Sequence, residues 1–534
     1  MNRFTRELVA VVLLLVGVLV VSTAFITPWL PENLLQARLA LPSAPFLIFY
    51  LLYVSALFLL GREALRRPSF SMIVLAISAA VALPFGVIYL AFGQVDMVSV
   101  LFHMQAGTFG VGPKALQTEI LTTLGCLSCL VVACYLVSAV YWMRHVPLVV
   151  ALLLFLANPY LIFQAKRWLL PVPDVDLTAM VTKPKIAGNP APPDIVYIYL
   201  EGLDRRFLSP DLDRETAAYL HDLEVQGLSF TDIRQMAGTG WSIAGMVASH
   251  CGVPLLPRGN LHDAIVEAVG DKFLPALTCL SDLLVDQGYD ATFVMGAEAR
   301  FAGTAAFYRT HGYSKTIAQK DMATLFTPEE VKQADVSWYA DDQMVLDAAR
   351  KEYTAALAND APFLLTIATI GSHGTLNYLS RDCTKSGRAA LSEDLFLAAR
   401  CMIGLTSRFV AEIQEQHRHS GRKNGLRIIL QSDHLNHGRS LLPSGAEIEV
   451  NTLILIGGPE QGQMNNRPGT MVDVYPTLLD WLGFPAEGGR AGLGVSLLAP
   501  EAGDTLVKTW GLPVLDRIVM NNIALFDKVW AGSH

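Results

Sequence analysis

The chain has 534 residues, of which 52% are hydrophobic and 16% are charged, and its formal net charge at pH 7 is −8. That length leaves room for more than one domain. The hydrophobic fraction is too high for an ordinary soluble protein, and the charged fraction is too high for a simple bundle of membrane helices. The acidic balance offers no basic surface for a phosphate backbone, so no nucleic-acid partner is expected.

Five long uncharged stretches in the first third of the chain predict transmembrane helices. They are residues 8–30, 39–61, 68–94, 120–143 and 146–165. Each is long enough to cross a bilayer core, which takes about 20 helical residues. A secretory signal accounts for the first stretch alone, and buried helices of a large soluble protein are a poor explanation for all five.

The distribution of Lys and Arg predicts the orientation of these spans. A cytoplasmic N-terminus places six arginines inside the cell: Arg3, Arg6, Arg62, Arg66, Arg67 and Arg144. The opposite loops hold only Arg38 and Lys114, with Lys166 and Arg167 as a small exception after the last span. An odd number of spans then delivers the rest of the chain to the outer face.

Residues 168–193 are rich in proline and lose hydrophobic periodicity, which is typical of an extended linker. We therefore expect a transmembrane anchor at 1–167, this linker, and an exported domain at 194–534. In that domain β-rich runs at 195–200, 291–295, 363–370, 427–431 and 452–456 alternate with helical stretches at 215–226, 277–287, 345–358 and 395–416. The alternation predicts an α/β fold, with a mostly parallel sheet covered by helices on both faces.

The cysteines divide between the two parts. Cys126, Cys129 and Cys134 lie in the fourth predicted span and are expected to be small apolar residues there. The other four lie in the exported domain, where an even count in an oxidising compartment predicts two disulfides. Three pairings are possible, and we favour the short-range one, Cys251–Cys279 with Cys383–Cys401. Zinc binding by these four is the alternative, although no Cys-x-x-Cys spacing supports it.

A candidate catalytic site emerges from three stretches. A glycine-containing polar turn at 238–242 leads into an apolar run, 243–249, which places Ser242 at a helix N-terminus where free N–H groups stabilise negative charge. Glu201 and the Asp433-His434 pair each follow a predicted strand, and the carboxyl ends of parallel strands converge. Carboxylates with an imidazole suit Mn²⁺ or Zn²⁺. Each residue alone is typical of a surface turn, but together they predict a metal site that activates Ser242 against a phosphodiester.

The same stretches carry a family resemblance. Residues 238–255 read GTGWSIAGMVASHCGVPL, followed by FVMGAEARFAG at 293–303, TIGSHG at 369–374, SDHL at 432–435 and VDVYPTLLDWLGF at 472–484. On these motifs, residues 194–498 resemble the alkaline phosphatase/sulfatase superfamily, specifically its membrane-anchored lipoteichoic-acid-synthase-like branch. Within that branch they look most like phosphoglycerol transferases that modify osmoregulated periplasmic glucans.

The resemblance implies roles for individual residues. Glu201, Ser242, Asp433 and His434 match the ligands of one divalent metal, with Mn²⁺ expected and Zn²⁺ or Mg²⁺ as alternatives. Ser242 matches the nucleophile, which is usually threonine, and Thr239 is its rival in the same loop. His373 matches a histidine that contacts the phosphoryl group or the leaving oxygen.

Two departures from related patterns matter. The Trp and Arg with which lipoteichoic acid synthases grip phosphoglycerol are absent near residues 302–304, and Arg300 is the nearest guanidinium that could bind substrate. The sulfatase signature is also absent at residues 251–255, which disfavours sulfate ester hydrolysis.

The resemblance further implies a phosphotransferase in the bacterial inner membrane with a periplasmic catalytic domain. The expected reaction transfers phosphoglycerol from phosphatidylglycerol in the lipid bilayer to a periplasmic glucan, through a glycerophosphoryl-Ser242 intermediate, and releases diacylglycerol. Alternatives are a phosphoethanolamine transferase, a polyglycerolphosphate transferase or phosphodiesterase, and a non-catalytic membrane scaffold.

Overall fold

A computed structural model describes residues 70–92, 95–105, 116–140, 143, 145–189, 191–257, 272–336, 339–374, 377–438, 441–445 and 448–531. The first two predicted spans lie outside these residues, as do most of the charges used to orient them. The chain divides into two compact units, one of residues 1–95 and 112–170 and the other of residues 96–111 and 171–534. The predicted boundaries at 167 and 193 stay predictions.

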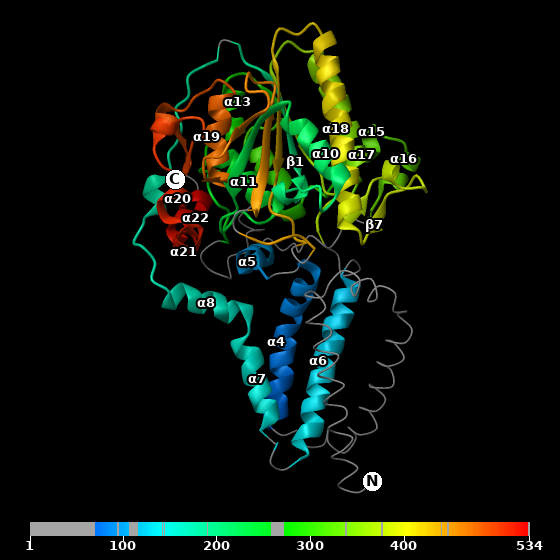
Figure 1. The fold of residues 1–534 in the computed structure, drawn as a ribbon, viewed down its shortest axis with the longest axis vertical. Helices are drawn as coiled ribbons and strands as arrows, with labels where there is room; N and C mark the ends of the chain where they lie inside the picture. The colour runs from blue at the N-terminus through cyan, green and yellow to red at the C-terminus, as the bar shows by residue number, and fades with distance from the viewer. Residues whose placement is uncertain are drawn as a thin grey trace. The chain divides into compact units, whose positions relative to one another are not determined.

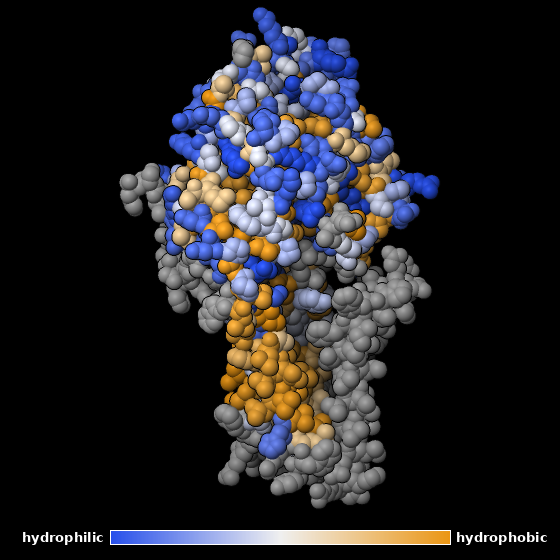
Figure 2. Space-filling view, turned by 60° about the vertical axis from the view of Figure 1, so that its left-hand side comes forward, coloured by the Kyte–Doolittle hydropathy of each residue, from blue (hydrophilic) through white to orange (hydrophobic). Residues whose placement is uncertain are grey.

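The first unit consists of apolar helices. Its described helices are α4 (Phe70–Phe92), α6 (Gln117–Ser138), α7 (Val146–Leu156) and α8 (Pro159–Leu169). Within the described residues, Ser71–Phe92 and Gln117–Ser138 are the helices long and apolar enough to cross a membrane. Figure 2 shows hydrophobic residues covering the surface of these helices, and Ile77, Val81 and Leu153 are more than half exposed. A surface of that kind is typical of a membrane-associated protein, whereas the predicted five-span bundle is not confirmed.

The fifth predicted span, residues 146–165, is not one helix. α7 ends at Leu156, and its 11 residues give a length of about 16 Å, well short of a bilayer core of about 30 Å. The Asn158 side chain accepts hydrogen bonds from Tyr160 N and Leu161 N and so caps a second helix, α8. Pro159 begins that helix and keeps Asn158 extended, so the chain cannot continue straight from α7.

The second unit is built on a mostly parallel mixed sheet, as the sequence predicts. Its strands lie in the order β10-β2-β9-β8-β1-β5-β3-β4, with β11 paired to β2. Their bounds are β1 (Asp194–Leu200), β2 (Gly227–Arg234), β3 (Asp290–Met295), β4 (Lys315–Ile317), β5 (Phe363–Ala368), β8 (Leu426–Ser432), β9 (Val450–Ile456), β10 (Gln463–Asn465) and β11 (Gly469–Thr470). Every residue of β1 is buried, as expected for the centre of such a sheet.

Helices cover both faces of this sheet (Figure 1). α11 (Ser242–Cys251), α13 (Leu280–Asp286) and α19 (Met471–Trp481) lie on one face; α10 (Arg214–Glu224), α17 (Asp342–Leu357) and α18 (Leu395–His419) lie on the other. α17 begins three residues before its predicted start because the Asp341 side chain accepts a hydrogen bond from Met344 N and caps the helix. The sequence missed β2, which pairs antiparallel to β9.

Both predicted disulfides are present, Cys251–Cys279 and Cys383–Cys401. The zinc alternative for these four cysteines is therefore wrong, because their sulfur atoms are bonded to one another. The remaining described α-helices are α5 (Met97–Gln105), α9 (Leu177–Met180), α14 (Thr304–Thr310), α15 (Met322–Leu325), α16 (Pro328–Ala334), α20 (Leu506–Trp510), α21 (Leu512–Asn521) and α22 (Ile523–Ala531). Two further antiparallel strand pairs are β6 (Asn377–Leu379) with β7 (Ala390–Ser392) and β12 (Arg490–Ala491) with β13 (Gly494–Val495).

Candidate active site

Three adjacent parallel strands, β8, β1 and β5, deliver most of the predicted site residues. Leu200 at the end of β1 pairs with Ser432 at the end of β8, so Glu201 and Asp433 leave the sheet at the same level. Tyr199 pairs with Ala368 at the end of β5, and the loop that follows carries His373. The carboxyl ends of the central strands therefore bring together residues that lie far apart in the sequence.

Ser242 reaches this place from the first turn of α11. Trp241 is the N-cap residue, with extended backbone angles, and Ser242 begins the helix. The Ser242 Oγ lies 3.3 Å from Glu201 Oε2 and 3.5 Å from His434 Nε2. Free N–H groups in this first turn favour negative charge at the hydroxyl.

A glycine allows the helix to come so near. A Cβ built on Gly245 would lie 1.7 Å from the carbonyl oxygen of Asp433, so no side chain fits between α11 and the loop after β8. Gly245 is itself helical, and its role is close approach.

Glu201, Asp433 and His434 form a buried cluster whose ligand atoms all lie within 4.8 Å of one another. His434 Nε2 lies 3.1 Å from Glu201 Oε1 and 3.4 Å from Asp433 Oδ2. Glu201 Oε1 is buried, and its near partner is this same imidazole. Two buried carboxylates so close together leave negative charge that a cation would neutralise.

The orientation of His434 also fits a metal ligand. Its Nδ1 lies 2.8 Å from the carbonyl oxygen of Leu435 and therefore carries a proton, which turns Nε2 toward the two carboxylates. Burial lowers the pKa of His434, but Asp433 and Glu201 outweigh burial and raise it to about 9. Burial, and then Asp433, raise the pKa of Glu201 to about 8. These raised pKa values mean that protons, one of them on His434 Nε2, offset the charge of the carboxylates. A divalent metal, which these residue types fit, would displace the proton from Nε2.

His373 lies beside the cluster, with its Nε2 3.9 Å from Glu201 Oε1. Burial, and then the nearby His434, lower the pKa of His373 to about 3. The imidazole is therefore neutral at neutral pH and can give or accept a hydrogen bond. The ring of His437 lies 5.3 Å from that of His373 and 4.3 Å from that of His434, a neighbour that the sequence did not predict.

Hydrogen bonds join the loops of the site to one another. Gly202 N donates to Asp433 Oδ1 at 2.9 Å, and Ser372 Oγ donates to the carbonyl oxygen of Glu201 at 2.6 Å. Asn436 Nδ2 donates to the carbonyl oxygens of both Gly202 and Ser372, at 3.0 and 2.8 Å. Asn436 was not predicted from the sequence, where its position two residues after His434 is the only signal.

The carboxylate of Asp342 binds the start of the loop that carries His373. It accepts hydrogen bonds from Ile370 N and Gly371 N, at 2.8 and 3.0 Å. Asp342 lies in the first turn of α17, and nothing in the sequence relates it to that loop.

A pocket beside Ser242 is mostly apolar. Its walls include Met246, Met295, Phe301, Thr304, Tyr339 and Ile370, together with Glu201 and Ser242 themselves. Arg300 is exposed and is not among the residues that line this pocket. Its predicted contact with substrate stays a prediction.

Thr239, the rival nucleophile, is fully buried. Its Oγ1 donates to the carbonyl oxygen of Met236 at 2.8 Å and accepts from Met236 N at 3.1 Å. These two bonds close the turn before Trp241 and give Thr239 a structural role.

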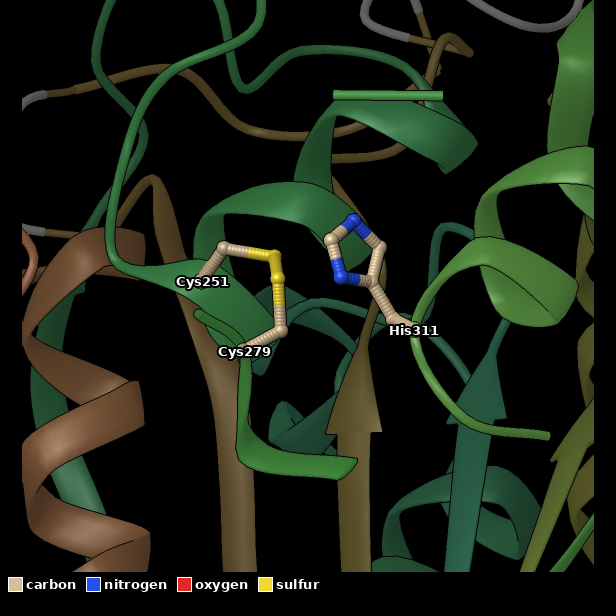
Figure 3. Close-up of side chains that lie close together, drawn as sticks. All are labelled: Cys251, Cys279 and His311. Atoms are coloured by element: carbon tan, nitrogen blue, oxygen red, sulfur yellow. A yellow bond between two sulfur atoms is a disulfide. The ribbon is translucent and has the colours of Figure 1, made fainter. Parts of the chain in front are cut away.

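A second cluster, Cys251, Cys279 and His311, has the residue types of a metal site but a different structure (Figure 3). Its sulfur atoms form a disulfide. The two ring nitrogens of His311 lie 2.8 Å from Asp282 Oδ2 and 3.1 Å from the carbonyl oxygen of Phe273. With sulfurs and nitrogens both engaged, this cluster stabilises the fold around the end of α11.

Known proteins resemble this chain over the same unit. The profile of the Sulfatase family matches residues 193–484. A phosphoglycerol transferase I from Salmonella arizonae is 31% identical over 297 residues, which cover 54% of this chain and 37% of that protein. One from Xanthomonas campestris pv. campestris is 31% identical over 362 residues, 66% of this chain and 50% of that protein. The chain thus spans half or less of the length of these curated relatives.

Solved structures with a similar arrangement have low sequence identity. A protein of the alkaline phosphatase superfamily from Vibrio parahaemolyticus is 18% identical, with a TM-score of 0.44, over 62% of this chain and 75% of that one. The lipoteichoic acid synthase LtaP from Listeria monocytogenes is 15% identical, with a TM-score of 0.43, over 60% and 80%.

Proposed function

We propose that this chain, which belongs to the Sulfatase family, is a metal-dependent phosphotransferase that moves phosphoglycerol from phosphatidylglycerol to a periplasmic glucan. Relatives named phosphoglycerol transferase I support the transferred group. The single observation that carries the proposal is the position of Ser242 Oγ, at a helix N-terminus and within 3.5 Å of both Glu201 and His434. The apolar first unit supports a lipid donor and a location in the bacterial inner membrane.

Glu201, Asp433, His434 and Ser242 would hold the divalent cation, for which we propose Mn²⁺. When bound, a cation lowers the pKa of a coordinated hydroxyl and offsets negative charge on phosphoryl oxygens. Ser242 Oγ gives up its proton to water and attacks the phosphorus of phosphatidylglycerol, the bond from phosphorus to the diacylglycerol oxygen breaks, and a glycerophosphoryl-Ser242 intermediate forms. The N-terminus of α11 stabilises the charge that develops near Ser242.

His373 is placed to orient the leaving oxygen. Because its imidazole is neutral, it donates a hydrogen bond to that oxygen. Either His373 or a water molecule that it orients supplies the proton to the leaving oxygen, and the proton released from Ser242 replaces it. A sugar hydroxyl of the acceptor then attacks the phosphorus, the Ser242 oxygen leaves and regains its proton, and the phosphoglycerol-substituted glucan is released. Two displacements through a covalent intermediate predict ping-pong kinetics.

The test uses the full-length protein with Mn²⁺ and phosphatidylglycerol labelled in the glycerol headgroup. We expect release of diacylglycerol and, in the absence of acceptor, label on Ser242 that mass spectrometry can locate. Ser242→Ala should lower release by at least about 10³-fold, because no hydroxyl remains to attack. Release of diacylglycerol from phosphatidylethanolamine instead would show that the donor is a different lipid. No release from either lipid would contradict the proposed activity and favour a non-catalytic membrane scaffold.

Thr239→Ser is the matched control, because it keeps the hydroxyl that closes the turn. This variant should stay active. In the unmodified protein, label on Thr239 instead of Ser242 would show that the nucleophile is assigned wrongly.

A further inference from the structure

Two helices outside the family-matched residues cover the loop that leads into Ser242, residues 235–241. The Sulfatase profile ends at residue 484 and begins at 193, but α5 (Met97–Gln105) and α21 (Leu512–Asn521) both contact this loop. Residues 93–96 alone separate α5 from the apolar helix α4 in the sequence. Nevertheless, α5 belongs to the compact unit that holds the active site.

Four apolar side chains of α5 are buried: Met97, Val98, Leu101 and Phe102. The Phe102 side chain is 0% exposed, and its ring centroid lies 5.5 Å from that of Trp241. The ring of His103 lies 6.1 Å from the same indole. Trp241 is only 5% exposed, so these contacts form part of a packed core.

Trp241 connects this packing to the nucleophile. It is the N-cap residue of α11, and its carbonyl oxygen accepts the first helical hydrogen bond, from Gly245 N at 3.0 Å. A fixed indole therefore fixes the direction in which Ser242 leaves the loop. The contacts of Ser242 Oγ with Glu201 and His434 are already long, 3.3 and 3.5 Å, so a small displacement would break them.

α21 holds the other end of the same loop. Asp516 accepts a hydrogen bond from Ala237 N at 2.7 Å. The loop is thus fixed at Ala237 by a helix from the C-terminal part of the chain and at Trp241 by a helix from its first quarter.

We infer that α5 is a working part of the catalytic unit and that Phe102 is a positioning residue for Ser242, acting through the indole of Trp241. The inference rests on the proposed function in one respect: Ser242 must be the nucleophile for the loop to affect turnover. The packing itself does not depend on the reaction.

The test compares Phe102→Ala with Met104→Ala in the full-length protein. Met104 lies on the same helix but is 56% exposed, so it is a matched control for changes to α5. Hydrogen–deuterium exchange of peptides covering residues 236–246 measures the loop, and diacylglycerol release gives kcat and KM separately. Phe102→Ala should speed exchange in these peptides and lower kcat by about tenfold or more, with KM within about twofold, because displacement of a reacting group by about 1 Å costs up to about 100-fold.

Phe102→Leu keeps an apolar side chain but loses the ring, so it should still speed exchange and should lower kcat less than Phe102→Ala does. It therefore tests the inference if Phe102→Ala does not fold. Unchanged exchange at 236–246 in both variants, an equal loss in Met104→Ala, or a rise in KM alone would overturn the inference. If the unmodified protein releases no diacylglycerol, the proposed function fails, while the exchange data still decide whether α5 holds the loop.

Discussion

The two sides of Ser242 are built in different ways. On one side lie the buried charges of Glu201, Asp433 and His434, and hydrogen bonds tie the loops that carry them to one another. On the other side lies a pocket with mostly apolar walls. Arg300, which precedes Phe301 of these walls in the sequence, is exposed.

The difference has a physical cause. Buried carboxylates are costly unless every oxygen has a partner, so their positions must be fixed by many bonds. An apolar wall depends mainly on the volume of its side chains, so it tolerates apolar substitutions of similar size. We therefore expect the charged side to be sensitive to small changes and the pocket side to be less so.

The largest effect should follow from Glu201→Gln, which keeps the shape of the side chain and removes its charge. Because two carboxylates and an imidazole attract the cation together, we expect the Kd for Mn²⁺ to rise by at least about 100-fold, more than the loss from changing an outer neighbour of a ligand. Isothermal titration calorimetry on the full-length protein measures the Kd directly.

Glu224→Gln is the control for this change. Glu224 is also buried, but it pairs with Arg205 at 2.7 Å and should affect stability without affecting the cation. Equal Mn²⁺ affinity in the Glu201 variant and the unmodified protein would show that the metal does not bind at Glu201.

A somewhat smaller effect should follow from Gly245→Ala. The new Cβ meets the Asp433 carbonyl oxygen at 1.7 Å, so α11 must move away from the charged side. A displacement of about 1 Å costs about 100-fold in rate, which kcat for diacylglycerol release would report.

Gly404→Ala provides the comparison, since Gly404 is also helical but its Cβ would lie 3.4 Å from Tyr219, an ordinary contact. The Gly404 variant should keep its activity and gain up to about 1 kcal/mol from helix propensity. Similar kcat values in the two variants would show that the distance between α11 and Asp433 does not matter.

The smallest effect should follow from Arg300→Ala on the pocket side. An exposed arginine that attracts the anionic donor should raise KM by up to about fivefold when it is removed and leave kcat within about twofold, since an exposed ion pair contributes at most about 1 kcal/mol. Arg309→Ala, which removes a second exposed arginine from the same region, should leave both constants unchanged. Equal effects of the two variants would reduce the role of Arg300 to general surface charge.

Much of the charged side could be predicted from sequence because its residues follow recognisable strands. The run before Glu201 is apolar and β-rich, as is the run before Asp433. Because neighbouring strands of a parallel sheet run in the same direction, the residues that follow them lie at the same edge of the sheet. The two disulfides could also be predicted, because cysteines separated by 28 and 18 residues can meet within one local segment.

The pocket side and the supports of the site could not be predicted in this way. Asp342, Asn436 and Phe102 act on backbone groups or rings far away in the sequence, and no local pattern distinguishes them from other polar or aromatic residues. Asn158 and Pro159 cause the break between α7 and α8. The apolar residues on both sides of them nevertheless led to the prediction of a single span.

By itself, then, the sequence determined which residues are candidates for binding a cation, that Ser242 and Thr239 are the candidate nucleophiles, and that an α/β domain would follow apolar helices. Only the tertiary structure decided how near Ser242 comes to Glu201, which groups hold the loops in place, and that α5 belongs to the second unit. The reason is that periodicity and chemical type are local properties of a chain, whereas distances between loops depend on the packing of all the elements between them.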